Sequence, residues 1–135
     1  MSFGFSVSDF VTLGQLAWKV YKSCKDAPQS FQNISQEVLS LSAVLREAEE
    51  VYSEKPLPQR TSEGLKTVGD GCHSVLKDLQ SLLDQYESLG TQAKRTWDRV
   101  GWCSKDIMEL RSRLTSNTSL LTAFIRLVYT YMILK

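Results

Sequence analysis

Residues Phe3 to Cys24 read FGFSVSDFVTLGQLAWKVYKSC, and this stretch decides the fold that the rest of the chain has to complete. Its polar residues are spaced four, three, four and three apart, at Ser8, Thr12, Gln15, Lys19 and Lys22. At 100° per residue they fall in one strip roughly 80° wide, although a surface helix needs an apolar stripe of only about 100°. The stretch therefore predicts a helix that is apolar or small around most of its circumference.

Two interpretations explain such a helix. It is either the central, most enclosed helix of a bundle, or a helix that is buried in one state and used against a membrane or a partner in another. A helix over 7–25 would be roughly 28 Å long, which nearly matches a hydrocarbon core of about 30 Å. The length permits a membrane role without requiring one.

Composition limits the class of protein. The chain has 135 residues, of which 42% are hydrophobic and 23% are charged, which fits one globular domain over 1–135. Its net charge is +1, which does not indicate the basic surface of a nucleic-acid-binding protein. The three cysteines, Cys24, Cys72 and Cys103, are odd in number and far apart, and no basic residue precedes the first apolar stretch. We therefore expect reduced, buried thiols and a cytoplasmic location.

Apolar residues recur every three or four positions along the whole chain. Ser6 and Asp9 are predicted to cap the first helix, and Gly14, which costs about 1 kcal/mol of helix propensity, predicts close approach by a neighbouring helix. The first helix carries an inner row of Phe10, Leu13, Ala17, Val20 and Cys24, beside a second row of Val7, Val11, Gly14, Trp18 and Tyr21. The later stripes are Phe31, Ile34, Val38, Leu41, Leu45, Ala48 and Tyr52; Leu65, Val68, Cys72, Val75, Leu79, Leu82 and Tyr86; and Ile107, Leu110, Leu114, Leu121, Phe124 and Val128.

These stripes predict long helices at about 7–25, 28–54, 62–89 and 104–133, and a short helix at 92–101. Thr61 or Ser62 would cap the third long helix, whose glycines suggest a kink or a late start, and Asn117 inside the last stripe would fix register. The short linkers favour antiparallel successive helices. The fold expected is an all-α antiparallel bundle of four long helices plus one short one. The apolar end at 120–134 suggests that the sequence was cut from a longer protein.

The residue types that catalysis or metal binding would need are scarce. His73 is the only histidine, and it stands beside Cys72 without a further ligand pair, so no metal site is expected. A nucleophile–base set cannot be drawn from one histidine, and no phosphate-binding loop is complete. The sequence predicts neither an enzyme nor a bound cofactor.

Five motifs carry a family resemblance: MSFGFSVSDF (1–10), WKVYK (18–22), CKDAP (24–28), FQNISQEV (31–38) and DIMELRSRLTSN (106–117). They resemble the N-terminal domain of fungal NOD-like receptors, which are STAND NTPases. That domain is similar in plan to plant coiled-coil immune-receptor domains and to the HeLo and mixed-lineage-kinase-like four-helix bundles. The resemblance implies fungal innate immunity, programmed cell death and heterokaryon incompatibility. It also implies NTPase and sensor domains further along the same receptor.

The resemblance implies a mechanism as well: self-association frees the first helix, and several copies then perturb the plasma membrane. At rest, Phe10, Leu13, Ala17, Trp18 and Tyr21 would pack against the second to fourth helices. The residues expected to contact lipid or other copies are Phe3, Phe5, Val7, Phe10, Val11, Leu13, Leu16 and Trp18. Asp9, Thr12 and Gln15 would line a pore, and Lys19, Lys22 and Lys25 would contact headgroups.

Simpler roles stay open for the same residues. Asp9 would only complete a helix cap, the three lysines would form a solvated helix end, and Trp18 would pack in the core. The alternative function is a protein–protein docking module that recruits a separate effector without touching a membrane, through the charged faces of the second and third helices. A third is a folding cap that keeps the receptor inactive.

Overall fold

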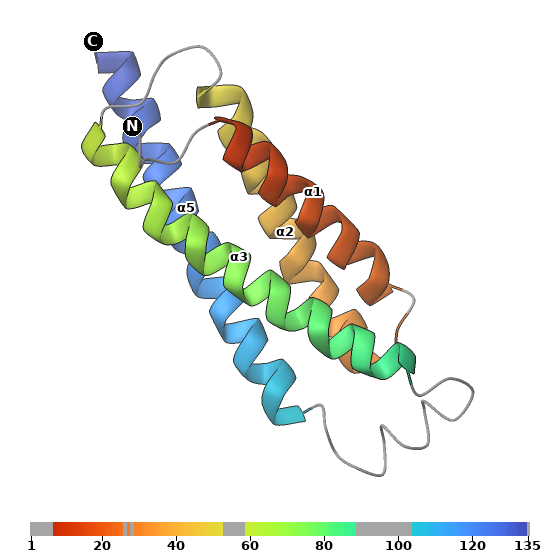
Figure 1. Cartoon of the computed structure of the whole chain (residues 1–135). Coiled ribbons are helices and arrows are strands. Elements are labelled where there is room, and N and C mark those ends of the chain that lie inside the picture. Colours follow the sequence, from red (N-terminus) through yellow and green to blue (C-terminus); the bar gives the residue numbers. More distant parts are fainter. Residues whose placement is uncertain (1–6, 26, 28, 53–58, 89–103, 135) are drawn as a thin grey trace.

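The protein is all-helical. In the computed structural model, residues 7–25, 27, 29–52, 59–88 and 104–134 are described. They form four helices, α1 (Val7–Lys25), α2 (Gln29–Tyr52), α3 (Gln59–Ser88) and α5 (Ser104–Leu134), without a strand among these residues (Figure 1). The all-α class is confirmed, whereas the short helix predicted at 92–101 lies outside the described residues.

The helix boundaries differ from the predicted ones mainly at α3. The bounds of α1 coincide with the prediction, but α3 begins at Gln59, three residues before the predicted start. Thr61 and Ser62 therefore lie inside its first turn rather than capping it. The helix is unbroken through Gly64, so the late start that the glycines suggested is wrong.

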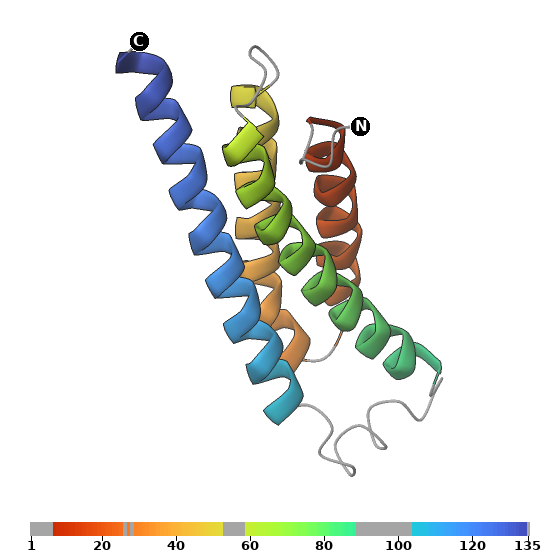
Figure 2. The same ribbon diagram turned by 60° about the vertical axis from the view of Figure 1, so that its left-hand side comes forward.

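The four helices lie side by side (Figures 1 and 2). Among the described residues, the main packing partners of α1 are α2 and α3, and the same two helices pack against α5. Helices α2 and α3 follow one another in the chain, yet they occupy opposite corners of the bundle. Helix α1 is thus a corner helix, and the interpretation of it as the enclosed centre is wrong.

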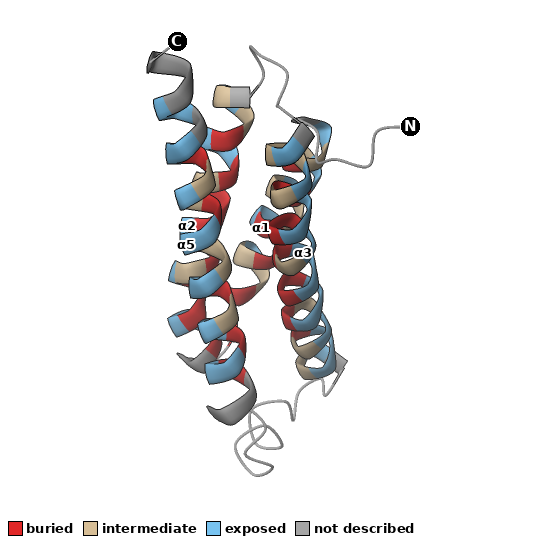
Figure 3. Ribbon diagram, turned by 90° about the vertical axis from the view of Figure 1, so that its left-hand side faces the viewer, coloured by how far each residue is buried: buried red, intermediate tan, exposed pale blue. Residues whose placement is uncertain are grey.

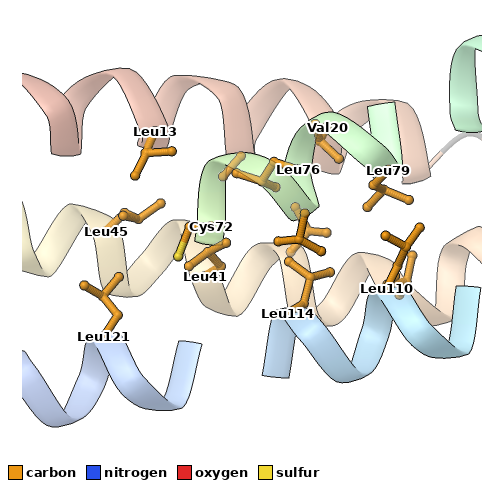
Figure 4. Close-up of a cluster of buried hydrophobic side chains, with 14 of the residues drawn as sticks. Leu13, Val20, Leu41, Leu45, Cys72, Leu76, Leu79, Leu110, Leu114 and Leu121 are labelled. Carbon is orange, nitrogen blue, oxygen red and sulfur yellow. The ribbon is translucent and has the colours of Figure 1, made fainter. Parts of the chain in front are cut away.

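The core lies along the axis between the helices (Figure 3). Every predicted inner-row residue of α1 is buried, as are the described members of the α2 stripe. Figure 4 shows side chains from all four helices meeting in this core. Three large apolar residues that are buried were absent from the predicted stripes, namely Leu76, Leu83 and Ile125, while Leu82, Tyr86 and Phe124 are only partly buried. The buried faces of α3 and α5 are therefore wider than the single stripes predicted for them.

Two glycines of α3 bring that helix close to α5. A Cβ built on Gly64 would lie 2.8 Å from the Phe124 ring, and one built on Gly71 would lie 2.5 Å from Oδ1 of Asn117. The amide of Asn117 donates to the carbonyl oxygen of Arg113 at 2.9 Å. At Gly14, by contrast, a Cβ would meet nothing within 4 Å, so the close approach predicted there is wrong.

Ion pairs fasten α5 to both of its neighbours. Arg111 donates to Glu37 of α2 at 2.7 Å. Arg113 donates to Asp78 of α3 at 2.8 Å and to the hydroxyl of Ser74 at 3.2 Å. These contacts hold α5 to both α2 and α3.

Candidate functional site

The inner row of α1 anchors that helix to the bundle. Phe10, Ala17, Val20 and Cys24 are fully buried and Leu13 nearly so. Figure 4 shows Leu13 pointing toward Leu45 of α2. Phe10 and Leu13, which were expected to contact lipid on activation, are therefore core residues in this state. Phe3 and Phe5 lie outside the described residues, as does the side chain of Val7.

The second row of α1 is only partly covered. Val11 and Tyr21 are half-buried and Trp18 is 43% exposed, and Leu16, which belongs to neither row, is half-buried as well. The Trp18 and Tyr21 rings lie 5.4 Å apart between centroids and are tilted by 35°. Tyr21 packs against the core. The Trp18 ring therefore lies on the solvent side of the Tyr21 ring. Trp18 was expected to pack against the other helices at rest, but its side chain is exposed, because the neighbouring helices leave that side of α1 uncovered.

An open groove lies between α1 and α2 beside Trp18. Its volume is about 290 Å³, and it is lined by Val11, Gly14, Gln15, Trp18, Ser42, Arg46 and Glu49. Ser42 is buried, and a side chain on Gly14 would meet nothing within 4 Å. Two small residues therefore leave a hollow between the exposed indole and the charged residues of α2.

The predicted polar strip of α1 is exposed over its whole length, at Ser8, Thr12, Gln15, Lys19 and Lys22. The Thr12 hydroxyl donates to the Ser8 carbonyl at 3.0 Å, and the neighbouring Ser23 hydroxyl donates to the Lys19 carbonyl at 3.2 Å. Such bonds stay within the helix. Both hydroxyls therefore keep an acceptor if α1 moves away from the bundle.

The basic end of α1 forms a second cleft, this time with α3. The cleft measures about 430 Å³ and is lined by Lys19, Lys22, Ser23, Ala27, Leu83, Tyr86 and Glu87. Sequence reasoning named both lysines but missed the wall from α3, because nothing in the spacing says which helices become neighbours. Lys25 is exposed and is not among the cleft residues, and Asp9 is half-buried. Ser6, the predicted capping partner of Asp9, lies outside the described residues.

The turn after α1 is tied by hydrogen bonds. The Ala27 N–H donates to the Cys24 carbonyl at 3.2 Å, and the Gln32 side chain donates to the Ala27 carbonyl at 3.0 Å. The C-terminal end of α1 is thereby fastened to the start of α2.

Reactive chemistry is not favoured by the described side chains. Cys24 and Cys72 are buried free thiols, as predicted, and burial raises the pKa of each to about 12, so neither is a thiolate at neutral pH. His73 is exposed, and no group of three potential metal ligands occurs within the described ranges. Cys103 lies outside them.

A search of the described helices finds none long and apolar enough to cross a membrane. No protein-family model, curated protein or solved structure matches the chain. The structure defines the class, an all-helical bundle whose amphipathic first helix occupies a corner. Its function is a proposal based on that helix and on the motifs quoted from the sequence.

Proposed function

We propose that this chain is the N-terminal cell-death effector domain of a fungal NOD-like receptor, acting through oligomerisation and membrane perturbation by α1. The observation that carries the proposal is that a single buried row of apolar side chains anchors α1 at a corner of the bundle. The five sequence motifs support the receptor family. The domain would be cytoplasmic at rest and reach the plasma membrane when attached NTPase and sensor domains cluster it.

The free energy needed to release α1 from the bundle is the reason that clustering is required. Burying one large apolar side chain stabilises a protein by about 1.5–3 kcal/mol. Helix α1 buries three such side chains in the bundle, those of Phe10, Leu13 and Val20. A single copy would lose this burial if α1 left the bundle. Several copies held together offset the loss, because their inner rows then meet lipid or one another.

The two faces of α1 would divide the work in the assembly. The apolar rows face lipid or other copies, while Ser8, Thr12, Gln15 and Lys19 face the common axis. The hydroxyl bonds of Thr12 and Ser23 remain inside the helix, which lowers the cost of leaving water. Lys22 and Lys25 would each gain about 1 kcal/mol near an anionic surface, and the tied turn at Ala27 would act as the pivot.

The finer architecture belongs to the same proposal. We infer antiparallel order for the successive helices and a short helix at 92–101 between α3 and α5. The contacts between α3 and α5 support the antiparallel order for that pair, since Gly64, Gly71 and Asp78 meet residues 124, 117 and 113 in turn. Domain function is proposed to need neither catalysis nor a cofactor.

Vesicle leakage tests the membrane role. Phe10→Glu is unsuitable, because Phe10 is fully buried and a charge there would unfold the bundle. Trp18→Glu instead places a charge on an exposed position of the lipid-facing row. We expect the wild-type domain, fused to an oligomerising tag, to release dye from anionic vesicles, and Trp18→Glu to release little.

Gln36→Glu is the matched control, since it adds the same charge to an exposed position of α2. This variant should leak like wild type. Leakage by Trp18→Glu at the wild-type rate, with the fold intact by circular dichroism, would contradict the membrane role of α1.

A docking module is the second candidate, and one observation favours it. Large apolar side chains of α5 are exposed at Met108, Leu120, Leu127 and Tyr129. These exposed apolar side chains are better docking contacts than the charged faces of α2 and α3. Flotation of the oligomerised domain with anionic vesicles separates the two functions, because a docking module would stay with the protein fraction.

A further inference from the structure

The groove between α1 and α2 has the features of one half of a symmetric contact. Trp18 projects from one end of it at 43% exposure. Gly14, one turn earlier on the same face of α1, leaves a hollow in which a Cβ would touch nothing within 4 Å. One helix thus carries both a projecting indole and an empty space beside it.

The charges on the wall of the groove are also self-complementary. Arg46 is exposed and Glu49 is half-buried, three residues later on the same face of α2. Within the described part of the chain neither of them takes part in an ion pair. In a two-fold contact, residue i of one copy meets residue j of the other, and j meets i. Arg46 of each copy would then face Glu49 of its mate.

From these observations we propose that two copies of this chain pair in the resting state through the groove of Val11, Gly14, Trp18, Ser42, Arg46 and Glu49. Trp18 of each copy occupies the Gly14 hollow of the other, and the two Arg46–Glu49 pairs close the contact. An indole that fills a pocket at the centre of an interface is a typical anchor residue. The pairing leaves both bundles folded and the inner row of α1 buried.

A second copy is favoured over other occupants by the balance of charge. A lipid surface that is anionic would attract Arg46 but repel Glu49, and an unrelated acidic or basic helix would satisfy only one of them. The two-fold mate satisfies both. Because the groove is small, we expect a weak dimer, below the area of standard interfaces.

Sedimentation equilibrium of the whole chain tests the pairing. Wild type should dimerise with a dissociation constant below about 1 mM. Gly14→Gln fills the hollow, and its Cβ meets nothing within 4 Å in the monomer, so it should stay folded and bind at least about tenfold more weakly. Thr12→Gln, which places the same new side chain on the exposed polar strip, is the control and should dimerise like wild type.

Charge variants test the two-fold geometry itself. Arg46→Glu alone and Glu49→Arg alone each place like charges opposite one another, so each should be monomeric. An equimolar mixture of the two variants should associate, because every cross-pair is then again opposite in sign. The double variant Arg46→Glu/Glu49→Arg should associate as well.

The proposal is overturned if wild type stays monomeric up to about 1 mM, if Gly14→Gln dimerises like wild type, or if the mixed charge variants fail to associate. Binding of the monomer to anionic vesicles with burial of the Trp18 indole would also overturn it, and would assign the groove to lipid. The pairing does not depend on cell death or leakage. A domain that dimerises but never leaks would contradict only the proposed membrane function.

Discussion

Gly71 of α3 and Asn117 of α5 lie so close that a Cβ on Gly71 would be 2.5 Å from Oδ1 of Asn117. Real Cβ atoms do not approach an oxygen that closely. The glycine therefore serves the contact between α3 and α5, and the helix propensity it loses is the cost of that contact. Gly64 stands seven residues earlier, against Phe124, in the same relationship.

Gly71→Ala is expected to lower the free energy of unfolding by about 1–3 kcal/mol, as overpacked substitutions do. The gain of about 1 kcal/mol in helix propensity will not compensate, because Asn117 must move and its bond to the Arg113 carbonyl is disturbed. Urea unfolding measures the effect. Gly14→Ala is the matched control: its Cβ meets open space, so it should stabilise the protein. Equal stabilisation by both variants would show that α3 and α5 are not in close contact.

Leu120 and Leu121 are neighbours in α5, but Leu120 is 52% exposed and Leu121 is 2% exposed. Leu121→Ala should therefore cost about 2–5 kcal/mol, whereas Leu120→Ala should stay within about 0.5 kcal/mol of wild type, as surface substitutions usually do. The comparison uses the same chemical change at adjacent positions. If the two variants unfold at the same urea concentration, the rotation of α5 in the bundle is wrong.

The ion pair Arg111–Glu37 should be coupled more strongly than Arg113–Asp78. The Glu37 side chain is 20% exposed and that of Asp78 is 55% exposed, so water screens the second pair more. A double-mutant cycle with alanine should give about 1 kcal/mol for the first pair and less for the second, near the usual values of surface pairs. Raising the salt concentration to about 1 M should weaken the coupling between Arg113 and Asp78 further. The reverse order would contradict the placement of α5 against α2.

The buried thiols predict a pH dependence of stability. Burial raises the pKa of Cys24 and Cys72 from 9.0 to about 12, so the folded state resists forming thiolates that the unfolded state forms readily. Their contribution is therefore complete below pH 9.0 and lost as the pH rises toward about 12. A variant with both Cys24→Ala and Cys72→Ala should lose less stability over this range in urea unfolding. An identical pH profile for both proteins would show that the thiols are not buried.

Some of this structure follows from the sequence and some does not. The buried row of α1 was predicted in full, because a helix with period 3.6 needs only local spacing to place its apolar face. The exposure of Trp18 was not, since its covering depends on which helices are neighbours. The same holds for two glycines. Gly14 was expected to allow close packing and meets open space, whereas Gly71 lies against Asn117 of α5. Which atoms lie opposite a glycine is decided by tertiary contacts between distant segments.

The candidate site, like the fold, was predicted in part. The polar strip was located by spacing and is exposed as expected. The two clefts on either side of α1 could not be foreseen, because α2 contributes three of the seven lining residues of one and α3 three of the seven of the other. The neighbours of α1 are set by the packing of α5 between α2 and α3, which no local pattern encodes.

The central claim is that α1 must leave its place in the bundle. Leu13 and Leu45 face one another between α1 and α2 (Figure 4), so the variant Leu13→Cys/Leu45→Cys, with Cys103→Ser to prevent mispairing, can lock α1 by a disulfide. Cys24→Ala and Cys72→Ala complete the variant, because both native thiols are buried in the same core cluster as Leu13 and Leu45. Non-reducing mass spectrometry establishes the bond before each assay.

The decisive measurement is dye release from anionic vesicles by this variant, fused to an oligomerising tag, before and after addition of dithiothreitol. The account predicts little release while the disulfide is closed and release near the wild-type rate once it is reduced. Equal release in both states, with the disulfide shown to be intact, would contradict it.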